Sequence, residues 1–288
     1  MQGDIVSSIL LPAILAFIMF ALGLGLTPDD FKRIVRQPRA LLVGVLCHFV
    51  ILPLACFGLI HLVGITGAFA VGFMILAACP SGSTSNLITY LARGDVALAV
   101  SFTAVASVVT IFTLPLIVSY SLGEFMGAEQ AVKAPVGTLM GQIFAIVALP
   151  VSLGMAARHF WPAAMRKFEG IATKMATVLF ILVVFAALAK NWALLRDNFS
   201  TLAPFAMGLN LAMLVVGFVA AWIARLGAKQ AVTLGIETAV QNATLAVVVA
   251  STVLKQDVMA MPGAVYGVLM YVGGLGFAFA VRRFNKPY

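Results

Sequence analysis

One polar stretch, CPSGSTSNLITYLARGD at residues 79–95, interrupts one of the most apolar parts of the chain. It begins with Pro80 and Gly82, two residue types that break helices. Hydroxyl and amide side chains follow: Ser83, Thr84, Ser85 and Asn86. Hard cations prefer such neutral oxygen ligands, and a broken helix also frees main-chain carbonyl and amide groups. The stretch therefore predicts a polar binding site inside an apolar environment.

A second stretch, TLGIETAVQNATLAVVVA at residues 233–250, carries the one acidic side chain that lies inside an apolar segment. The other nine of the 10 acidic residues fall in loops or at segment ends. A carboxyl group at membrane depth costs about 2.5–3.5 kcal/mol on insertion scales, so it usually faces a cavity, a partner or an ion. Glu237 is that residue, Gln241 follows one helical turn later on the same face, and Asn242 lies beside it.

The composition is that of a protein solvated by lipid. The chain has 288 residues, of which 62% are hydrophobic and only 10% are charged, whereas soluble domains carry about 25% charged residues. Apolar runs near 20 residues recur throughout, and the short alternation of a β-barrel is absent from the sequence. The net charge of +8 reflects loop lysines and arginines and predicts no nucleic-acid partner. The three cysteines lie in apolar segments and predict neither a disulfide nor a metal site.

The sequence predicts an all-α polytopic membrane protein with nine spans and no soluble domain. The expected segments are 5–26, 40–60, 67–92, 96–119, 135–157, 171–189, 201–224, 230–254 and 260–281. This division places fourteen of the 18 lysines and arginines on one side. The positive-inside rule then puts the N-terminus outside and the C-terminus in the cytoplasm, and we expect a bacterial inner (cytoplasmic) membrane location.

The two polar stretches fall in the third and eighth segments, which are five apart and so run in opposite directions through the bilayer. Paired interrupted helices in two inverted halves indicate the binding site of a secondary transporter. Unwound carbonyls can bind a cation, and half-helix N-termini favour an anion. One carboxylate, Glu237, suits a monovalent cation, and neutral oxygens come from Ser85, Asn86 and Thr103.

These motifs resemble those of the bile acid:sodium symporter family. The similarity extends over IMFALGLGLTPDDFKRIVRQPRALLVGVLCHFVILP (18–53), ALAVSFT after the first break, IETAVQNATLA and MPGAVYGV (261–268). It implies a single transporter unit with a core domain of crossed, broken helices and a panel domain that rocks against it. Ten-span members have two inverted five-helix repeats. Here the first half, about 1–120, would lack one span, and the second would cover about 130–288.

The resemblance also implies two sodium sites. The first would use Ser85, Asn86, Thr103 and Glu237, while a further family hydroxyl falls at Ala99, which has none. The second would use Glu237, Gln241 and the main chain near Thr238 and Val240, and its usual glutamine falls at His48. A histidine titrates near neutral pH, so H⁺ is a second candidate for coupling, beside Na⁺.

The substrate predicted by the resemblance is an organic anion that is bile-acid-like, pantoate-like or keto-acid-like. Its candidate contacts are Ser83, Thr84, Asn242 and Tyr271, the last at the position of a family asparagine. The predicted function is uptake of this anion with sodium by alternating access, performed by a monomer or weak homodimer in the lipid bilayer. A proton-coupled or sodium-independent carrier of the same fold is the alternative.

Other classes of protein use some of the same residues. A serine of GSTS (82–85) with His48 could form the dyad of an intramembrane hydrolase, but this leaves Glu237 and the second break without a role. A channel, a substrate-sensing receptor or a cation/proton antiporter shares parts of the architecture. In the blandest interpretation, the polar side chains only join helices by hydrogen bonds.

Overall fold

The computed structural model describes residues 9–27, 37–127 and 136–282, and the regular elements within them are helices joined by turns. The first half contributes α2 (Leu11–Gly25), α4 (Pro38–Leu46), α5 (Leu52–Val63), α6 (Gly67–Ala78), α7 (Thr84–Leu91) and α8 (Val96–Met126). The second contributes α10 (Val136–Ile143), α11 (Leu149–Phe160), α12 (Pro162–Lys190), α13 (Trp192–Ile223), α14 (Ala228–Ala239), α15 (Ala243–Val248) and α16 (Asp257–Arg282).

The described ranges contain three five-residue π-helical turns, Cys47–Ile51, Phe144–Ala148 and Val249–Val253. The first two join α4 to α5 and α10 to α11, and the third continues α15 without reaching α16. The first turns of α5 and α11 contain Pro53 and Pro150. Proline has no backbone N–H and cannot make the usual α-helical hydrogen bond, which accounts for the wider turn before it. Hydropathy predicts uninterrupted spans over both stretches.

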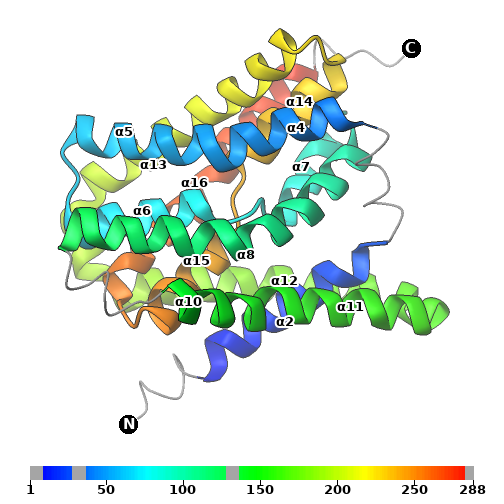
Figure 1. The fold of residues 1–288 in the computed structure, drawn as a ribbon, viewed down its shortest axis with the longest axis horizontal. Coiled ribbons are helices and arrows are strands. Elements are labelled where there is room, and N and C mark those ends of the chain that lie inside the picture. The colour runs from blue at the N-terminus through cyan, green and yellow to red at the C-terminus, as the bar shows by residue number, and fades with distance from the viewer. Residues whose placement is uncertain (1–8, 28–36, 128–135, 283–288) are drawn as a thin grey trace.

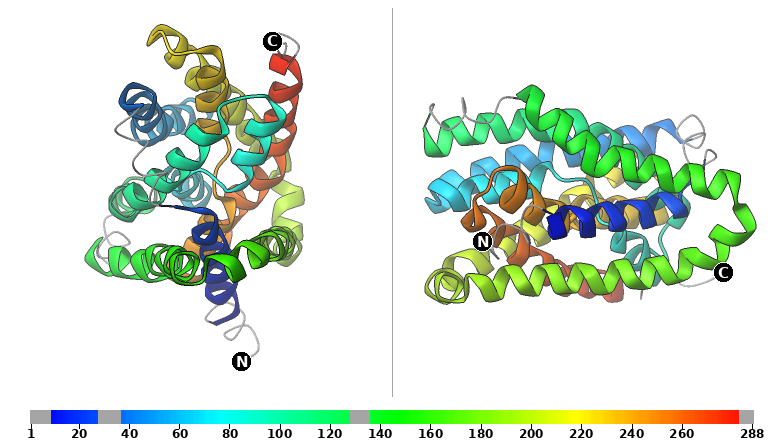
Figure 2. Two further views of the ribbon diagram at one scale, coloured as in Figure 1. Left: turned by 90° about the vertical axis from the view of Figure 1, so that its right-hand side faces the viewer. Right: turned by 90° about the horizontal axis from the view of Figure 1, so that it is seen from below.

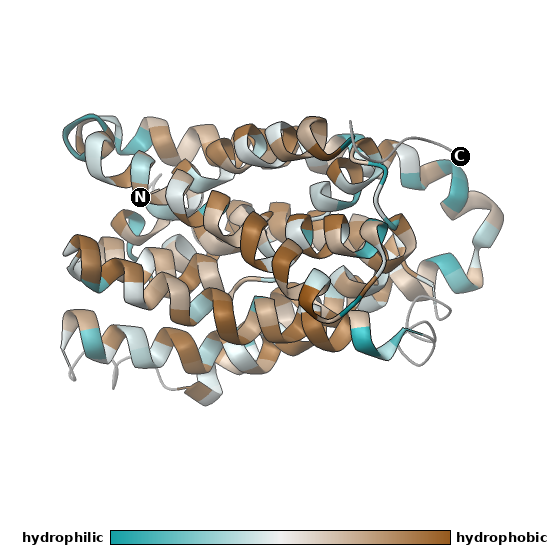
Figure 3. Ribbon diagram, turned by 90° about the horizontal axis from the view of Figure 1, so that it is seen from above, coloured by the Kyte–Doolittle hydropathy of each residue, from teal (hydrophilic) through white to brown (hydrophobic). Residues whose placement is uncertain are grey.

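Within the described ranges, six helices are long and apolar enough to cross a bilayer: Pro38–Val63, Val96–Met126, Val136–Phe160, Pro162–Lys190, Trp192–Ile223 and Asp257–Arg282. The chain is a multi-pass membrane protein. Three shorter apolar helices, Leu11–Gly25, Gly67–Ala78 and Ala243–Val253, accompany them, and the count of nine spans stays a prediction. Hydropathic colouring shows apolar residues along the helices and hydrophilic ones gathered mainly toward helix ends and connections (Figure 3).

Several helices extend beyond the segments that hydropathy predicts. The helix expected over 96–119 continues to Met126, and the one expected from residue 171 begins at Pro162. Similarly, the segment expected from residue 201 begins at Trp192. Backbone hydrogen bonding continues where the side chains become polar, and Pro162 is favourable in a first helical turn. Apolar length therefore underestimates helix length here.

Helices α2, α11 and α12 form one layer. This layer lies along one side of the remaining bundle (Figures 1 and 2). Close packing of α2 on α11 depends on two glycines: a Cβ at Gly23 would collide with Val151 O, and one at Gly154 with Phe20 O. Small residues let membrane helices approach closely in this way. In the rest of the bundle, α13 packs on α14 and α16, while α6 contacts α8 and α16.

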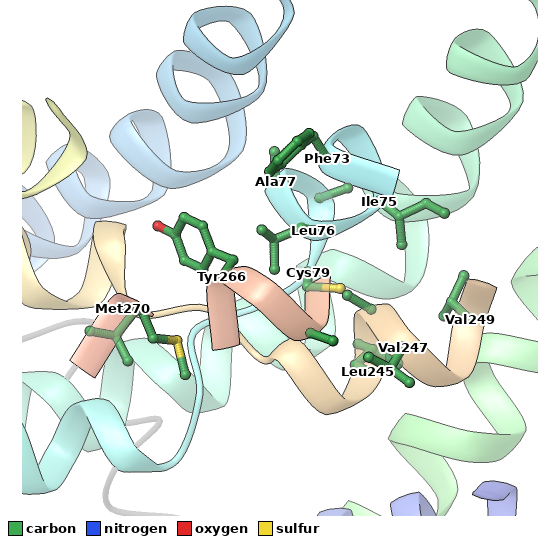
Figure 4. Packing of buried hydrophobic residues seen from close by; sticks show 14 of the residues in the cluster. Phe73, Ile75, Leu76, Ala77, Cys79, Leu245, Val247, Val249, Tyr266 and Met270 are labelled. Carbon is green, nitrogen blue, oxygen red and sulfur yellow. The ribbon is translucent and has the colours of Figure 1, made fainter. Parts of the chain in front are cut away.

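The most deeply buried apolar packing surrounds the ends of the broken helices. Figure 4 shows Phe73 and Cys79 of the α6 segment, Leu245 of α15 and Tyr266 of α16 gathered at this point. All four are fully buried. The polar site therefore lies in a part of the bundle that is close-packed and screened from both lipid and water.

Candidate functional site

The two interrupted helices meet at their breaks. The α6–α7 break spans residues 79–83, and the α14–α15 break spans residues 240–242. Two hydrogen bonds join them: Gly82 N donates to Val240 O at 3.0 Å, and Asn242 N donates to Pro80 O at 2.9 Å. Together they form an antiparallel β-bridge between Ser81 and Gln241. Two segments about 160 residues apart in sequence therefore share one short backbone ladder at the centre of the fold.

Glu237 lies in the last turn of α14 and is completely buried. Its Oε2 accepts a hydrogen bond from Thr103 Oγ1 of α8 at 3.1 Å, and Thr103 Oγ1 is 3.1 Å from Ser81 Oγ. The Ser81 hydroxyl therefore lies beside both Thr103 and the Glu237 carboxylate. Ser81 belongs to the polar stretch of the first break but is not among the site residues that the sequence predicts.

Three oxygens of the predicted site are buried without a hydrogen-bond partner: Glu237 Oε1, Ser85 Oγ and Asn86 Oδ1. The Ser85 hydroxyl lies close to the Glu237 carboxylate. Gln241 Oε1 and Asn210 Oδ1, at and near the second break, are also buried without a partner. Buried oxygens without donors are costly, so native structures rarely contain several of them together. An all-oxygen set with a single carboxylate is the chemistry that a monovalent hard cation requires. These residues fit the first predicted sodium site.

Ala99 lies one helical turn before Thr103 in α8 and is fully buried. The methyl side chain of Ala99 supplies no oxygen to the cluster. Ser81, from the first break, supplies a hydroxyl group next to Thr103. Across the described ranges, no three side chains among His, Cys, Asp and Glu come together as metal ligands. The cluster is therefore suited to an alkali cation rather than to zinc or another transition metal.

The residues of the second predicted sodium site are arranged differently. His48 Nδ1 lies 3.1 Å from Glu237 O, and its Nε2 lies 2.9 Å from Cys79 O. The Thr238 carbonyl accepts from Gln241 Nε2 at 2.7 Å, and Val240 O accepts from Gly82 N. The Thr238 and Val240 carbonyls therefore already have donors, whereas Gln241 Oε1 is buried without one. The second predicted sodium site stays a prediction.

The position of His48 also bears on the hydrolase alternative. A catalytic dyad needs a ring nitrogen within hydrogen-bond reach of a serine hydroxyl. Both ring nitrogens of His48 instead face main-chain carbonyls. The geometry therefore gives no support to a Ser–His dyad in this chain.

The four predicted substrate contacts lie around one cavity. Ser83, Thr84, Asn242 and Tyr271 line it with Gln241, and the opposite wall comes from α2 and α12 through Ile18, Ala176, Thr177 and Phe180. The free space is about 30 Å³, enough for about two waters. Tyr271 donates its hydroxyl to Thr84 Oγ1 at 3.0 Å. Asn242 caps α15 through Oδ1, which accepts from Leu245 N at 3.0 Å.

Two residues outside the predicted set hold the second break. Asn210 of α13 donates from Nδ2 to Ala239 O at 3.0 Å, and Tyr266 of α16 donates its hydroxyl to the same carbonyl at 2.7 Å. Both side chains are fully buried. Asn210 is the only asparagine in the segment predicted at 201–224, and an amide at membrane depth is a signal that sequence reasoning could have used.

Comparison with known proteins gives the class of the chain. The model of the sodium bile acid symporter family matches residues 12–198. The chain belongs to this family, whose members are transporters rather than enzymes.

Relatives from plants, bacteria and mammals are similar to the chain over most of its length. A probable chloroplastic sodium/metabolite cotransporter of rice, BASS2, is 27% identical and covers 95% of this chain. The uncharacterized sodium-dependent transporter YocS of Bacillus subtilis is 28% identical over 90% of it. The ileal sodium/bile acid cotransporter of rabbit is 30% identical over 84%.

The chain spans 64% of the length of the rice relative, 79% of YocS and 69% of the rabbit protein. Sodium appears in the names of all three relatives, which supports Na⁺ as the coupling ion.

Proposed function

We propose that the protein is a secondary active symporter that couples sodium influx to uptake of an organic anion. The observation that carries this proposal is that Glu237 Oε1, Ser85 Oγ and Asn86 Oδ1 are buried without partners, in the last turn of α14 and the first turn of α7 beside the two breaks. Membership of the sodium bile acid symporter family supports the same assignment.

Sodium would be held by Ser85, Asn86, Thr103 and Glu237. The ion would offset the buried negative charge of Glu237 and give the unpartnered oxygens a positive partner. These ligands come from α7, α8 and α14, so a bound ion would hold three elements together. The neighbouring Ser81 hydroxyl supports Thr103 by hydrogen bonding to it.

The anion would bind in the cavity on the other side of the breaks. The first residues of α7 and α15, Thr84 and Ala243, both line it, and α15 continues through its π-helical turn to Val253. Helix N-termini attract negative charge through their free N–H groups and dipole. The Tyr271 and Thr84 hydroxyls add polar contacts, and Ser83 and Asn242 complete the candidate set.

Coupling follows from the shared first turn of α7. Thr84 faces the anion cavity, whereas the next two residues, Ser85 and Asn86, carry oxygens of the ion cluster. Sodium binding would order this turn and thus the N-terminus that receives the anion. Such coupling must be reciprocal, so the anion would raise sodium affinity by the same factor.

Loading and release would require the helix layers to separate. The free space of about 30 Å³ is too small for a bile-acid-like, pantoate-like or keto-acid-like anion. Since α2 and α12 form one wall of the cavity, we assign the α2–α11–α12 layer to the panel domain and the rest of the bundle to the core. Rocking of one against the other would expose the site alternately to each side of an inner membrane.

We further propose an N-terminus outside and a C-terminus in the cytoplasm, with a monomer or weak homodimer as the working unit. The charge tally behind this orientation includes six cations that lie outside the described residues: Lys32, Arg33, Arg36, Lys133, Arg283 and Lys286. Proton coupling remains the alternative for the ion, and it is tested in the same experiment.

The test is uptake by proteoliposomes that contain the purified chain. Labelled taurocholate, pantoate and pyruvate would be offered under an inward sodium gradient, an inward proton gradient, or neither. We expect concentrative uptake of at least one anion only with the sodium gradient, and its loss in Glu237→Gln. Uptake driven by the proton gradient alone would contradict sodium coupling, and uptake that only equilibrates would indicate a passive pore.

A further inference from the structure

Breaking α14 exposes the carbonyls of its last turn, which would be natural ligands for a second cation. Each carbonyl from Glu237 to Val240 instead faces a nitrogen or hydroxyl group. Their partners are, in order, His48 Nδ1, Gln241 Nε2, the pair Asn210 Nδ2 and Tyr266 OH, and Gly82 N. The Thr238, Ala239 and Val240 carbonyls thus have donors from the chain itself, and Glu237 O has one when His48 carries a proton on Nδ1. Gln241 Oε1, beside this turn, is buried without a partner.

His48 is held firmly in its position. It lies in the π-helical turn Cys47–Ile51 and is completely buried. Its ring packs against Phe49 and Phe102, with centroid separations of 4.8 and 5.5 Å. Its two nitrogens bridge the breaks, one facing Cys79 O after α6 and the other Glu237 O in α14. In either charge form, the ring fills the space beside the Glu237 carbonyl that a cation would need.

The charge of the site also favours a single bound sodium ion. Glu237 is the only acidic residue inside an apolar segment, and its two carboxylate oxygens belong to the Ser85, Asn86 and Thr103 cluster. One sodium balances this carboxylate. Before the anion binds, a second would add a positive charge that no described acidic side chain of the cluster balances, which is unfavourable in a buried site.

We propose that the chain binds one sodium ion, at the Glu237 cluster, and that the His48 ring takes the place of a second cation between the two breaks. This inference rests on the proposed sodium-coupled function and specifies its stoichiometry. One sodium carried with a monovalent anion transfers no net charge, so uptake of such an anion would be insensitive to membrane potential.

The direct test is equilibrium binding of ²²Na⁺ to the purified protein in detergent, with no transport involved. We expect saturation at one ion per chain with a Hill coefficient of one, and no saturable binding in Glu237→Gln. Saturation at two ions per chain would overturn the inference while leaving sodium coupling intact. An absence of saturable binding in the natural chain would instead overturn the proposed function itself.

The role of His48 is tested with His48→Gln, whose amide supplies an oxygen and no longer bridges the two carbonyls. We expect its capacity to rise toward two ions per chain, with a Hill coefficient above one. The matched control is His61→Gln, because His61 lies in the same continuous helix but is half-exposed near its end. The control should retain one ion.

Gel filtration and thermal melting identify variants that remain folded, and His48→Asn replaces His48→Gln if the latter does not. A folded His48 variant whose capacity stays at one ion would show that His48 does not exclude the second, and would overturn that part of the inference.

Discussion

At the residue scale, the account depends on which buried oxygens have hydrogen-bond donors. Thr103 differs from most membrane threonines, which bond a carbonyl of their own helix, because it donates to Glu237 of another helix at 3.1 Å. Thr113, in the same helix, makes the common bond, to Val109 O at 3.3 Å. Two threonines of one helix therefore have different predicted roles.

We expect Thr103→Val to weaken sodium binding about tenfold, equivalent to about 1.4 kcal/mol, because it removes one ion ligand and the donor to Glu237 Oε2. Thr113→Val is the matched control: it makes the same substitution outside the oxygen cluster and should leave sodium affinity unchanged. Sodium titration of the melting temperature measures both. Equal affinities in the two variants would remove Thr103 from the ion site.

Tyr271 tests the anion cavity in the same way. Loss of its hydroxyl in Tyr271→Phe removes the donor to Thr84 Oγ1. A neutral hydrogen bond is worth about 0.5–1.5 kcal/mol, so we expect the KM for the anion to rise about three- to tenfold. Tyr120→Phe, at an exposed position of α8, is the control. A changed sodium affinity with an unchanged KM would contradict a role for Tyr271 in the anion cavity.

At the element scale, the second break is held by side chains of α13 and α16, two helices that contribute no residue to the predicted ion cluster. Asn210 and Tyr266 bind Ala239 O, and Gly273 of α16 gives Asn210 room to do so. A Cβ at Gly273 would collide with Asn210 Oδ1, whereas Gly276, in the same helix, has nothing within 4 Å of its Cβ position. The second break is thus stabilised by hydrogen bonds whose geometry depends on the close packing of α13 against α16.

Gly273→Ala should therefore destabilise the protein by about 1–3 kcal/mol, the usual range for overpacking. We expect a lower melting temperature together with weaker sodium binding, since Asn210 would be displaced from Ala239 O. Gly276→Ala should retain both properties. If the two variants melt at the same temperature, Asn210 adjusts without cost and its support of the break is unimportant.

The sequence predicts the polar elements of the site better than their arrangement. Glu237, Ser85 and Asn86 can be found because polar side chains are rare at membrane depth. The first break can be found because Pro80 and Gly82 interrupt an apolar run, and the second because Gln241 and Asn242 follow Glu237. The donors to individual carbonyls cannot be found in this way. His48 and Tyr266 reach the breaks only through the packing of distant helices, and hydropathy contains no information about that packing.

At the scale of the whole molecule, an ion pair between described residues joins the two layers. Lys190, the last residue of α12, contacts Asp257, the first residue of α16, at 2.6 Å. A cavity of about 230 Å³ lies beside the pair and is lined by both layers, with Val183 of α12 and Val247 of α15 among its walls. Exposed ion pairs contribute little stability, but this one lies where the layers would separate.

We expect uptake to stop when Lys190→Cys and Asp257→Cys are joined by a short bis-methanethiosulfonate, because the cross-link would hold α12 against α16. Each cysteine thiolate forms a disulfide with the reagent and releases methanesulfinate, so reduction should restore transport. The native cysteines Cys47, Cys56 and Cys79 are buried, so the reagent should be selective. Uptake that continues in the cross-linked protein would contradict relative movement of the layers.

The control joins two helices of the same layer. Arg158 of α11 and Glu169 of α12 form an ion pair, and cysteines at positions 158 and 169 can be cross-linked in the same way. Since both helices belong to the proposed panel domain, this cross-link should leave transport active. Inhibition by both cross-links would point to a general effect of restraint at α12.

The central claim is that the oxygen cluster around Glu237 binds sodium, and thermal melting in NaCl against KCl at equal ionic strength tests it most directly. A ligand that binds only the folded state stabilises it by about 1.4 kcal/mol at ten times its Kd, which for this chain corresponds to about 3–6 °C. The account predicts such a rise in NaCl for the natural chain and none for Glu237→Gln. Identical melting temperatures of the natural chain in the two salts, or an equal rise in Glu237→Gln, would contradict it.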